Sequence, residues 1–558
     1  MKEDLRSLSI AVLLSFVVIY TVNYFFNPNK IQLAEQELKI NQAQDALNKA
    51  SVDVIEKNDA IVETRDVIKN SARISFKNNA VSGTIRLNGS RFDNLMLERY
   101  NKSIDNNTNK VELLAPGKTK SSYFAELGWL SLDSSIKLPS SDTLWETKDN
   151  LVSNDKPAVL TWDNGNGLKF IRKISLDENY LFTITDTVEN LSGEDIEVFP
   201  YALINRNINN KEQTRSVVHE GMSALIDSTL KEFKYSDIDA GDSESFDTKE
   251  GWVGFSDRYW FSALITPKGE KNKITLKNNN NNNYQIDYLG ERKIITNGEA
   301  TSYTYKLFSG AKEIKLLDKY TKKDHIHKFD LAVDFGWYYF LTKPFFYILD
   351  ALYCLLGNMG WAILLFAALL RLLMFPVANK SFVNMAKMKA IQPKILEIKE
   401  KYGNNNMLIQ QATMELYKKE KINPASGCLP MLIQIPVFFS LYKVLNIAIE
   451  IRHAPFVGWI KDLTAPDPLT LSHMLHIPLP SFIDIGLWPI FMGITMWVQQ
   501  KLNPAPTNNE QAKMLTLMPV FFTFMLGHFA SGLVIYWTLS NLLSIIQQKV
   551  IMHKNGVK

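Results

Sequence analysis

A single arginine lies inside an uncharged, apolar stretch of the chain. Residues 351–370, which precede Arg371, carry no charge, and neither do residues 372–377. An arginine near the middle of a lipid bilayer costs roughly 2.5–3.5 kcal/mol on insertion scales. Two interpretations follow. Either the side chain extends to the lipid headgroups from a position near the cytoplasmic side, or it faces water inside the membrane and attracts an acidic group.

Other polar side chains occur in the apolar runs of the last third of the chain. Taken singly, each such side chain more often forms a hydrogen bond between helices than serves as a functional group. Several of these runs are short, and short helices thin the bilayer around them. Polar residues on such helices predict a water-accessible cleft that contains Arg371. Besides Arg371, the polar residues are Gln434, Thr495, Gln499, Thr538, Ser540, Asn541 and Gln547.

Histidines offer little support for an enzyme or a metal site. His325 and His327 have the spacing of a metal-binding pair, but Asp324 and the lysines before it favour a solvated loop. His219 has no carboxylate pair beside it, and the histidines of an outer loop are similarly isolated: His453, His473 and His476. No phosphate-binding loop occurs in the sequence. We therefore expect no catalytic residue, no cofactor and no metal, and we expect that the chain is not an enzyme.

Composition places these residues in a membrane protein with a large polar insert. The chain has 558 residues, a net charge of +4 and 46% hydrophobic residues. One apolar run opens the chain, a polar block of about three hundred residues follows, and apolar runs dominate the last third. The two cysteines, Cys354 and Cys428, both lie in apolar runs, so the polar block has no disulfide framework.

The N-terminal part predicts an anchor, a tether and a β-domain. Residues 8–26 carry no charge and are followed by no small-x-small cleavage site, which predicts that residues 1–27 form an uncleaved signal-anchor helix. Residues 28–70 are polar and predict a periplasmic tether, helical or loosely ordered. From about residue 72 the hydrophobic period becomes two, which predicts a large β-sandwich over residues 71–331.

Turn signals divide that β-domain into strands. Asn88-Gly89 between two alternating runs predicts a hairpin with a type I′ turn. Alternation before and after residues 177–179 predicts a second hairpin, and alternation at residues 303–307 predicts a strand near the end of the domain. The asparagine run at residues 278–283 predicts an exposed loop tip.

The last third predicts an α-helical bundle with six transmembrane helices in all, counting the anchor. Residues 332–344 are aromatic and too short to span, so they predict an interfacial amphipathic helix ended by Pro344. Residues 345–377 predict the second transmembrane helix, with Arg371. Residues 425–558 predict four more, three of them with apolar runs of about 14–16 residues.

A helical hairpin is expected at residues 378–424, between the second and third transmembrane helices. Residues 376–423 hold nine lysines against four glutamates, which favours the cytoplasmic side. Pro393 should kink the first arm. The charges of the loops place both ends of the chain in the cytoplasm and residues 28–344 in the periplasm.

Five segments of the C-terminal part are similar to the YidC family of membrane-protein insertases. They are GNMGWAILLFAALLRLLMFP (357–376), MAKMKAIQPKILEIKEKYG (385–403), INPASGCLPMLIQIPVF (422–438), IEIRHAPFVGWIKDLTAPDP (449–468) and SGLVIYWTLSNLLSIIQQ (531–548). The order of one anchor and a large β-domain resembles the Gram-negative form of that family. The resemblance implies a β-supersandwich for the periplasmic domain.

What the resemblance implies is an insertase and chaperone of the bacterial inner membrane. It implies a hydrophilic groove open to the cytoplasm and to lipid, containing Arg371, Gln434, Trp537 and Ser540. It further implies contact of Phe438 and Met518 with the substrate helix. The resemblance also implies that a cytoplasmic hairpin is needed for activity. This hairpin contains Met385, Lys389, Pro393, Tyr402 and Gly403.

Partners are also implied by the resemblance rather than read from the residues. They are nascent membrane proteins, the lipid bilayer and the Sec translocon, with the ribosome and the signal recognition particle receptor as further candidates. No nucleic-acid specificity is expected. The periplasmic domain either docks the translocon or acts as a spacer, and the sequence leaves both open.

Departures from the family pattern concern the polar lining of the groove. A family threonine is Ala367 here, and a family tyrosine is matched by Trp537, whose indole donates one hydrogen bond and accepts none. A transporter or channel remains the alternative function. It would require polar residues through the full depth of the bilayer and usually an inverted repeat, and the sequence contains no such repeat.

Overall fold

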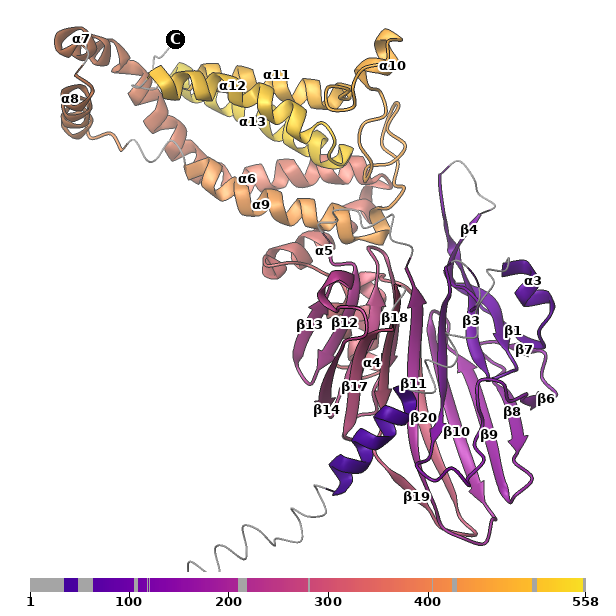
Figure 1. Ribbon diagram of the computed structural model, residues 1–558. Helices are drawn as coiled ribbons and strands as arrows, with labels where there is room; N and C mark the ends of the chain where they lie inside the picture. Colours follow the sequence, from indigo (N-terminus) through magenta and orange to yellow (C-terminus); the bar gives the residue numbers. More distant parts are fainter. Residues whose placement is uncertain are drawn as a thin grey trace, which may run out of the picture. The chain divides into compact units, whose positions relative to one another are not determined.

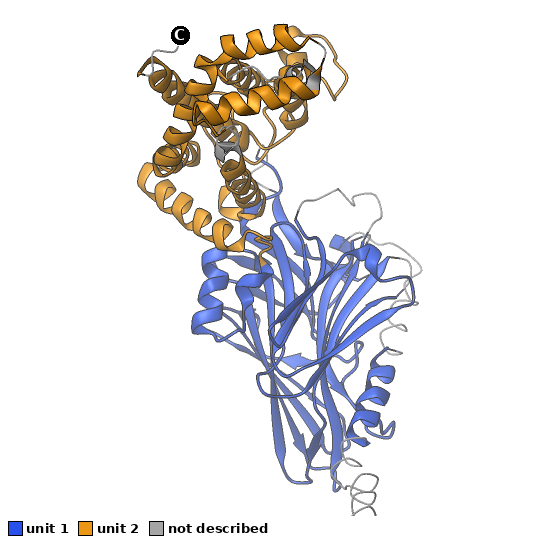
Figure 2. Ribbon diagram, turned by 90° about the vertical axis from the view of Figure 1, so that its left-hand side faces the viewer, with its two compact units in different colours: residues 1–332 blue, residues 333–558 orange. Residues whose placement is uncertain are grey.

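The computed structural model describes residues 35–48, 64–104, 109–117, 119, 121–208, 218–279, 282–403, 405–423, 429–503 and 509–554. The chain divides into two compact units, residues 1–332 and residues 333–558 (Figure 2). The predicted signal anchor and Cys428 lie outside the described residues.

Unit 1 is built on two sheets in which antiparallel pairing dominates (Figure 1). Within the described residues, the eleven-stranded sheet has the order β14-β17-β18-β11-β5-β3-β2-β1-β7, with β19 on β11 and β4 on β3. The nine-stranded sheet has the order β13-β12-β15-β16-β20-β10-β9-β8-β6. The strands are β1 (Arg73–Lys77), β2 (Val81–Arg86), β3 (Arg91–Asn101), β4 (Lys110–Leu114), β5 (Tyr123–Leu130), β6 (Glu146–Thr147), β7 (Leu151–Val152), β8 (Ala158–Asp163), β9 (Leu168–Leu176), β10 (Leu181–Asn190), β11 (Ile196–Asn207), β12 (Gly221–Ile226), β13 (Thr229–Phe233), β14 (Ser243–Thr248), β15 (Gly251–Ser256), β16 (Trp260–Ile265), β17 (Asn272–Asn278), β18 (Asn283–Leu289), β19 (Lys293–Ile295) and β20 (Ala300–Ala311).

Side chains from the two sheets meet in a shared core. Along β9, buried and more exposed residues alternate, as the hydrophobic pattern predicts for a strand with one buried face. Tyr305 of β20 donates a hydrogen bond to the backbone oxygen of Gly128 on β5, at 2.8 Å. Arg172 of β9 donates to the backbone oxygen of Leu127 at 2.9 Å. The predicted β-rich domain is therefore confirmed.

The first predicted hairpin is present, but its turn differs. β2 and β3 pair as far as Arg86 and Arg91, so the loop has four residues rather than two. A type I′ turn would need positive φ angles at both Asn88 and Gly89. The two consecutive positive φ angles occur one residue later, at Gly89 (+72°) and Ser90 (+48°). A Cβ atom on Gly89 would lie 2.6 Å from the backbone oxygen of Ser141. Close packing against this distant segment shapes the loop, which local turn preference cannot anticipate.

The asparagine run is also less exposed than expected. Asn278 ends β17 and Asn283 begins β18, and both side chains are buried. The exposed tip predicted for residues 278–283 is therefore wrong at both of its ends, because strand pairing extends into the run. Residues 280–281 lie outside the described part.

The predicted tether contains a helix, residues 35–48, that packs on the eleven-stranded sheet. Ala43 and Leu47 are 0% and 2% exposed and contact residues of β5, β11 and β18. Gln44 donates a 2.9 Å hydrogen bond to the buried carboxylate of Asp287. Of the two predicted forms of the tether, helical and loosely ordered, the helical form is present over these residues. A short helix, α3 (Thr64–Lys69), precedes β1, and α4 (Ile314–Lys323) follows β20.

Unit 2 is helical. α6 packs on α13, α13 on α11, and α11 on α12, whereas α9 packs on α5 and also contacts α6 and α13. Lys443 of α9 forms a 2.7 Å ion pair with Asp334, which precedes α5. The helices are α5 (Tyr339–Leu356), α6 (Met359–Ala390), α7 (Gln392–Tyr402), α8 (Asn406–Lys419), α9 (Leu429–Ile447), α10 (Leu471–Leu475), α11 (Leu487–Leu502), α12 (Asn509–Leu526) and α13 (Ser531–Lys554).

Two described helices, α5 and α6, are long and apolar enough to cross a membrane. Shorter apolar helices occupy residues 432–447 and 513–526. The count of six transmembrane helices stays a prediction. α13 has 24 residues, longer than its apolar run of about 14–16 residues, because polar residues at its C-terminal end continue the helix.

Two predicted helix boundaries in unit 2 are wrong. The predicted interfacial helix does not end at Pro344: α5 begins at Tyr339 and continues through this proline to Leu356. A proline near the start of a helix removes only one backbone hydrogen bond. The break comes at Gly357, in the left-handed conformation, and the Asn358 side chain then accepts a hydrogen bond from the Trp361 backbone and begins α6.

Pro393 does not kink a continuous arm of the hairpin. α6 continues to Ala390, and α7 begins at Gln392, with the proline in its first turn. There the missing N–H has no partner to lose, so proline marks a helix start.

Candidate functional site

Arg371 lies beside a small cavity between α6, α9 and α13. The cavity volume is about 20 Å³, room for about one water molecule. Predicted groove residues Arg371, Gln434 and Ser540 all line it, although they come from three helices that are distant in sequence. The full lining is Ala367, Leu370, Arg371, Met374, Val377, Ala378, Ile433, Gln434, Val437, Tyr536 and Ser540.

The Arg371 guanidinium contacts neutral partners only. Its Nη2 donates a hydrogen bond to Ser544 Oγ, and Ser544 Oγ donates in turn to the Ser540 backbone oxygen at 2.7 Å. The centre of the guanidinium lies 5.9 Å from the centroid of the Phe382 ring. Its Nε is buried without a hydrogen-bond partner. Across the described residues, no carboxylate lies within ion-pair distance of the guanidinium, so its charge has no ionic partner.

Tyr536 takes the position in the cavity that the sequence comparison gave to Trp537. Gln434 Nε2 donates a 2.8 Å hydrogen bond to the Tyr536 hydroxyl, which links α9 to α13. Tyr536, Ser540 and Ser544 are spaced four residues apart and share one face of α13. The sequence prediction missed Tyr536 and Ser544. Their spacing of four residues from Ser540 was the sequence feature that could have identified them.

Trp537 faces elsewhere because one residue turns the helix by about 100°. Its ring lies 4.7 Å from the Phe438 ring and 6.2 Å from the Phe522 ring. Together these side chains join an apolar cluster around Met492, Leu526 and Val534. Trp537 is therefore a packing residue in this conformation and not part of the cavity lining.

The two predicted contacts of a substrate helix are only partly exposed. Phe438 belongs to the apolar cluster just described, and Met518 on α12 is half-buried. Larger apolar exposure lies elsewhere on the same two helices: Leu432, Ile435 and Phe439 on α9, and Met514, Leu517, Val520 and Phe521 on α12.

The remaining polar residues of the bundle connect helices or bond within them. Asn541 donates to the Thr495 hydroxyl at 3.2 Å, joining α13 to α11. Gln547 donates to the Phe375 backbone oxygen at 3.4 Å, joining α13 to α6. Thr538 bonds within α13, at 2.8 Å to the Val534 backbone oxygen. Gln499 is half-buried on α11.

The predicted hairpin residues separate into two groups. Met385 lies on α6, where it packs with Phe382 and with Ile551 of α13 rather than in the hairpin. Lys389 is half-buried near the end of α6, and Pro393 is exposed at the start of α7. Tyr402 ends α7, and Gly403 (φ +55°) follows it.

The two arms of the hairpin share a small apolar core of their own. It contains Ile391, Ile395 and Ile422, with Met388, Leu416 and Tyr417 packed against them. Lys394 and Glu420 form a 2.7 Å ion pair at its surface.

The histidines of unit 1 make ordinary contacts. His327 Nε2 lies 3.1 Å from the Ser228 hydroxyl, and its Nδ1 lies 3.7 Å from a Glu250 carboxylate oxygen. Among the described residues, no group of three or more His, Cys, Asp and Glu side chains could hold a metal ion.

Known families and curated relatives match this chain along almost its whole length. Residues 351–557 match the 60Kd inner membrane protein family, and residues 73–348 match the YidC periplasmic domain family. The membrane protein insertase YidC of Rickettsia bellii is 43% identical over 98% of this chain and 99% of its own. The corresponding protein of Rickettsia canadensis is 42% identical, with the same coverage of both chains.

Solved structures show weaker likeness. A crystal structure of an active YidC insertase with its first transmembrane domain resolved is 18% identical, covers 85% of this chain and 91% of its own, and has a TM-score of 0.36. A galactose mutarotase related enzyme from Lactobacillus acidophilus is 10% identical over 43% of this chain and 97% of its own, with a TM-score of 0.30. The assignment therefore rests on the sequence matches: this chain belongs to the YidC family of inner-membrane proteins.

Proposed function

We propose that this membrane protein insertase receives the polar tail of its substrate at Arg371. Curated relatives that share 43% and 42% of its residues are named as membrane protein insertases and not as enzymes. These names confirm the expectation that the chain is not an enzyme. They do not favour the alternative of a transporter or channel. The observation that carries the proposal is the uncompensated guanidinium, bonded to Ser544 and facing a small cavity between three helices.

The cavity must widen before a peptide can enter it. At about 20 Å³ it holds a water molecule but no side chain. α9 packs mainly on α5, and the Gln434–Tyr536 hydrogen bond links it to α13. Breaking that bond lets α9 separate from α13. An acidic residue of the tail then replaces Ser544 as the partner of Arg371 in a low-dielectric site, where the interaction is strong.

Apolar burial then moves the substrate's transmembrane segment into lipid. Each Å² of apolar surface removed from water contributes about 25 cal/mol, so no nucleotide is required. Exposed apolar side chains on α9 and α12 offer the first contact for that segment. The newly made protein would be inserted and folded in this way alone or with the Sec translocon.

The lysine-rich hairpin of α7 and α8 would face the cytoplasm. From there it would meet the ribosome or the signal recognition particle receptor. The β-domain is periplasmic, by its match to the YidC periplasmic domain family.

Reconstitution tests the role of Arg371. The purified protein in liposomes is given a single-span substrate with a short acidic tail, and insertion is measured by protease protection of the tail. We expect insertion by the wild type, reduced insertion by Arg371→Lys and none by Arg371→Leu. Lys380→Leu removes an exposed charge from the same helix outside the cavity and should insert normally. Equal insertion by both Arg371 variants would contradict the electrostatic step and leave Arg371 as a membrane anchor.

A further inference from the structure

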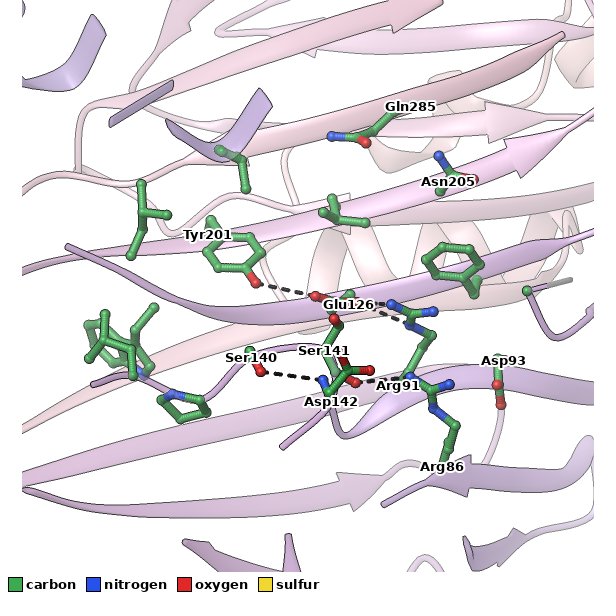
Figure 3. Close-up of a pocket in the computed structure, with 18 of the residues that line it drawn as sticks. Arg86, Arg91, Asp93, Glu126, Ser140, Ser141, Asp142, Tyr201, Asn205 and Gln285 are labelled. Atoms are coloured by element: carbon green, nitrogen blue, oxygen red, sulfur yellow. Dashed lines mark hydrogen bonds and ion pairs between the residues drawn. The ribbon is translucent and has the colours of Figure 1, made fainter. Parts of the chain in front are cut away.

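A second cavity lies in unit 1, in the β-domain (Figure 3). Its volume is about 530 Å³, within the range of about 300–1,000 Å³ found for small-ligand sites. Residues of β2, β3, β5, β11 and β18 line it, together with Leu47 of the docked helix and a loop at residues 131–142. Insertion chemistry in the membrane makes no use of this cavity.

Two arginines of the lining have hydrogen-bond donors to spare. Arg91 is 5% exposed, and its Nε and Nη2 donate to one Glu126 oxygen at 3.0 and 2.6 Å. Arg86 donates from Nε to the Asn88 backbone oxygen at 2.9 Å and from Nη2 to the Ser141 backbone oxygen at 3.0 Å. Within the described part of the chain, neither Nη1 has a hydrogen-bond partner. Figure 3 shows both guanidinium groups close together at the cavity.

The cavity also has one positive charge in excess at its buried end. Glu126 pairs with Arg91, and Asp93 pairs with Arg73 through two bonds of 2.7 and 3.0 Å. No described carboxylate lies within ion-pair distance of Arg86, and burial together with the neighbouring Arg91 charge lowers the pKa of the Arg86 guanidinium. Asp133 and Asp142 also line the cavity, but both side chains are exposed, so water screens their charge.

We propose that this cavity binds a ligand through a carboxylate held by the Nη1 groups of Arg86 and Arg91. A carboxylate compensates the excess charge and accepts both free donors, which suits the fork geometry of arginine. The other walls supply aromatic surface from Phe124 and Tyr201. The ligand therefore carries a carboxylate and an apolar part.

Matched ligand pairs test this chemistry on the full-length protein in nanodiscs. Ligand-observed NMR at millimolar concentration compares N-acetylglutamate α-amide with N-acetylglutamine α-amide, glucuronate with glucose, and benzoate with benzamide. We expect at least one carboxylate to bind about tenfold or more tightly than its neutral partner. Selective binding of the glutamate probe assigns the ligand to an acidic polypeptide segment, whereas selective binding of glucuronate or benzoate assigns it to a free small acid. Equal binding within all three pairs, or no binding at all, overturns the proposal.

Two variants remove the site in independent ways. Arg86→Gln removes a guanidinium, and Arg99→Gln, whose arginine pairs with Glu313 outside the cavity, is the matched control. Gly117→Leu keeps both arginines and covers the site, because a Cβ there meets Arg91 Nη1 at 3.7 Å and Phe124 at 3.9 Å, both ordinary contacts.

We expect Arg86→Gln and Gly117→Leu each to weaken carboxylate binding by about tenfold or more, and Arg99→Gln to leave it unchanged. If Arg86→Gln fails to fold because the Ser141 loop is released, Gly117→Leu decides the question. Unchanged binding in Gly117→Leu overturns the assignment to this cavity. Insertion activity in liposomes does not enter any of these outcomes, so the proposal stands or fails separately from the role of Arg371.

Discussion

Arg172, Arg371 and Arg86 differ in whether their hydrogen-bond partners are charged or neutral. Arg172 is buried between the two sheets and donates to both Asp186 oxygens, at 2.7 and 2.6 Å. Arg371 and Arg86 donate only to a hydroxyl and to backbone oxygens. Removing the ionic partner of a buried charge destabilises the fold, whereas a buried charge with neutral partners can still accept an ionic ligand.

Asp186→Ala tests the structural role. The change leaves the Arg172 charge buried and unpaired, and we expect unit 1 to lose about 3–5 kcal/mol of unfolding free energy. Glu189→Ala on the same strand is the control, because its ion pair with Lys169 is exposed and 3.9 Å long. That control should cost less than about 1 kcal/mol. Chemical denaturation of the purified protein, followed by tryptophan fluorescence, measures both, and equal losses would contradict a special role for the buried pair.

Tyr536→Phe tests the hydrogen bond that links α9 to α13. Without the hydroxyl, Gln434 loses its acceptor, and the two helices should separate more often. A net hydrogen bond is worth about 0.5–1.5 kcal/mol, so a cysteine at Ser540 should react about twofold to tenfold faster with a water-soluble maleimide. Trp537→Phe keeps the Gln434–Tyr536 bond and is the control. Identical alkylation rates in both would show that this bond does not hold the cavity closed.

Three of the four polar residues that line the membrane cavity were predictable, because a charged or polar residue inside an apolar run is a strong local signal. Arg371, Gln434 and Ser540 were identified by type and position, and Tyr536 and Ser544 were missed although they repeat at the helical spacing of Ser540. Arg86 and Arg91 gave no such signal. The predicted hairpin of β2 and β3 pairs Arg86 with Arg91, but the return of the Ser141 segment to Arg86 is a long-range contact that a sequence does not show.

Elements were predictable where the hydrophobic period was clear. β9 and β10 alternate strongly and pair as expected around the turn at residues 177–179. An uninterrupted apolar run has no alternation of polar and apolar residues to mark where one helix ends and the next begins. The break between α5 and α6 at Gly357 was therefore not predicted. Pro344 misled for a related reason: it lies inside α5, where packing by neighbouring helices offsets one lost backbone bond.

Docking of the helix at residues 35–48 is an element-scale property that can be measured. Ala43 is fully buried against the sheet, and a glutamate there would place a charge in apolar contact. We expect Ala43→Glu to release the helix and to increase amide hydrogen exchange across it by tenfold or more, which is about 1.4 kcal/mol. Leu38→Glu on the exposed side is the control, since Leu38 is 58% exposed. Unchanged protection in Ala43→Glu would contradict the docking.

Asp467 organises the start of α11. Its Oδ1 accepts hydrogen bonds from the Trp459 indole (2.8 Å) and the Leu469 backbone (3.0 Å), and its Oδ2 accepts one from the Trp488 backbone (2.8 Å). Because Asp467→Ala leaves three donors without partners, we expect a loss of about 2–4 kcal/mol of unfolding free energy.

Thermal unfolding in detergent measures the Asp467→Ala change. Asp462→Ala is the matched control, because Asp462 bonds only within its own turn, to the backbone and hydroxyl of Thr464. A smaller loss in Asp467→Ala than in this control would contradict the capping role.

At the scale of the whole molecule, the two units carry separate chemistry. Unit 2 holds the apolar helices and Arg371, and unit 1 holds the β-domain with its larger cavity. The predicted topology places the β-domain and the lysine-rich hairpin on opposite sides of the bilayer. Loop charges predict this: residues 28–344 outside, and the hairpin and both chain ends inside.

Cysteine labelling tests that topology in full. In a chain without Cys354 and Cys428, single cysteines replace exposed residues: Asn166 and Lys461 on the predicted outer side, Glu400 and Lys513 on the predicted inner side. A membrane-impermeant maleimide applied to spheroplasts should label the first pair alone, and permeabilisation should expose the second pair. This pattern requires that the chain cross the bilayer an odd number of times between Asn166 and Glu400. In the predicted topology of six transmembrane helices it crosses once there, through α6. If α5 and α6 both crossed the bilayer, Asn166 and Glu400 would share one side and be labelled together, and the predicted six-helix topology would be wrong.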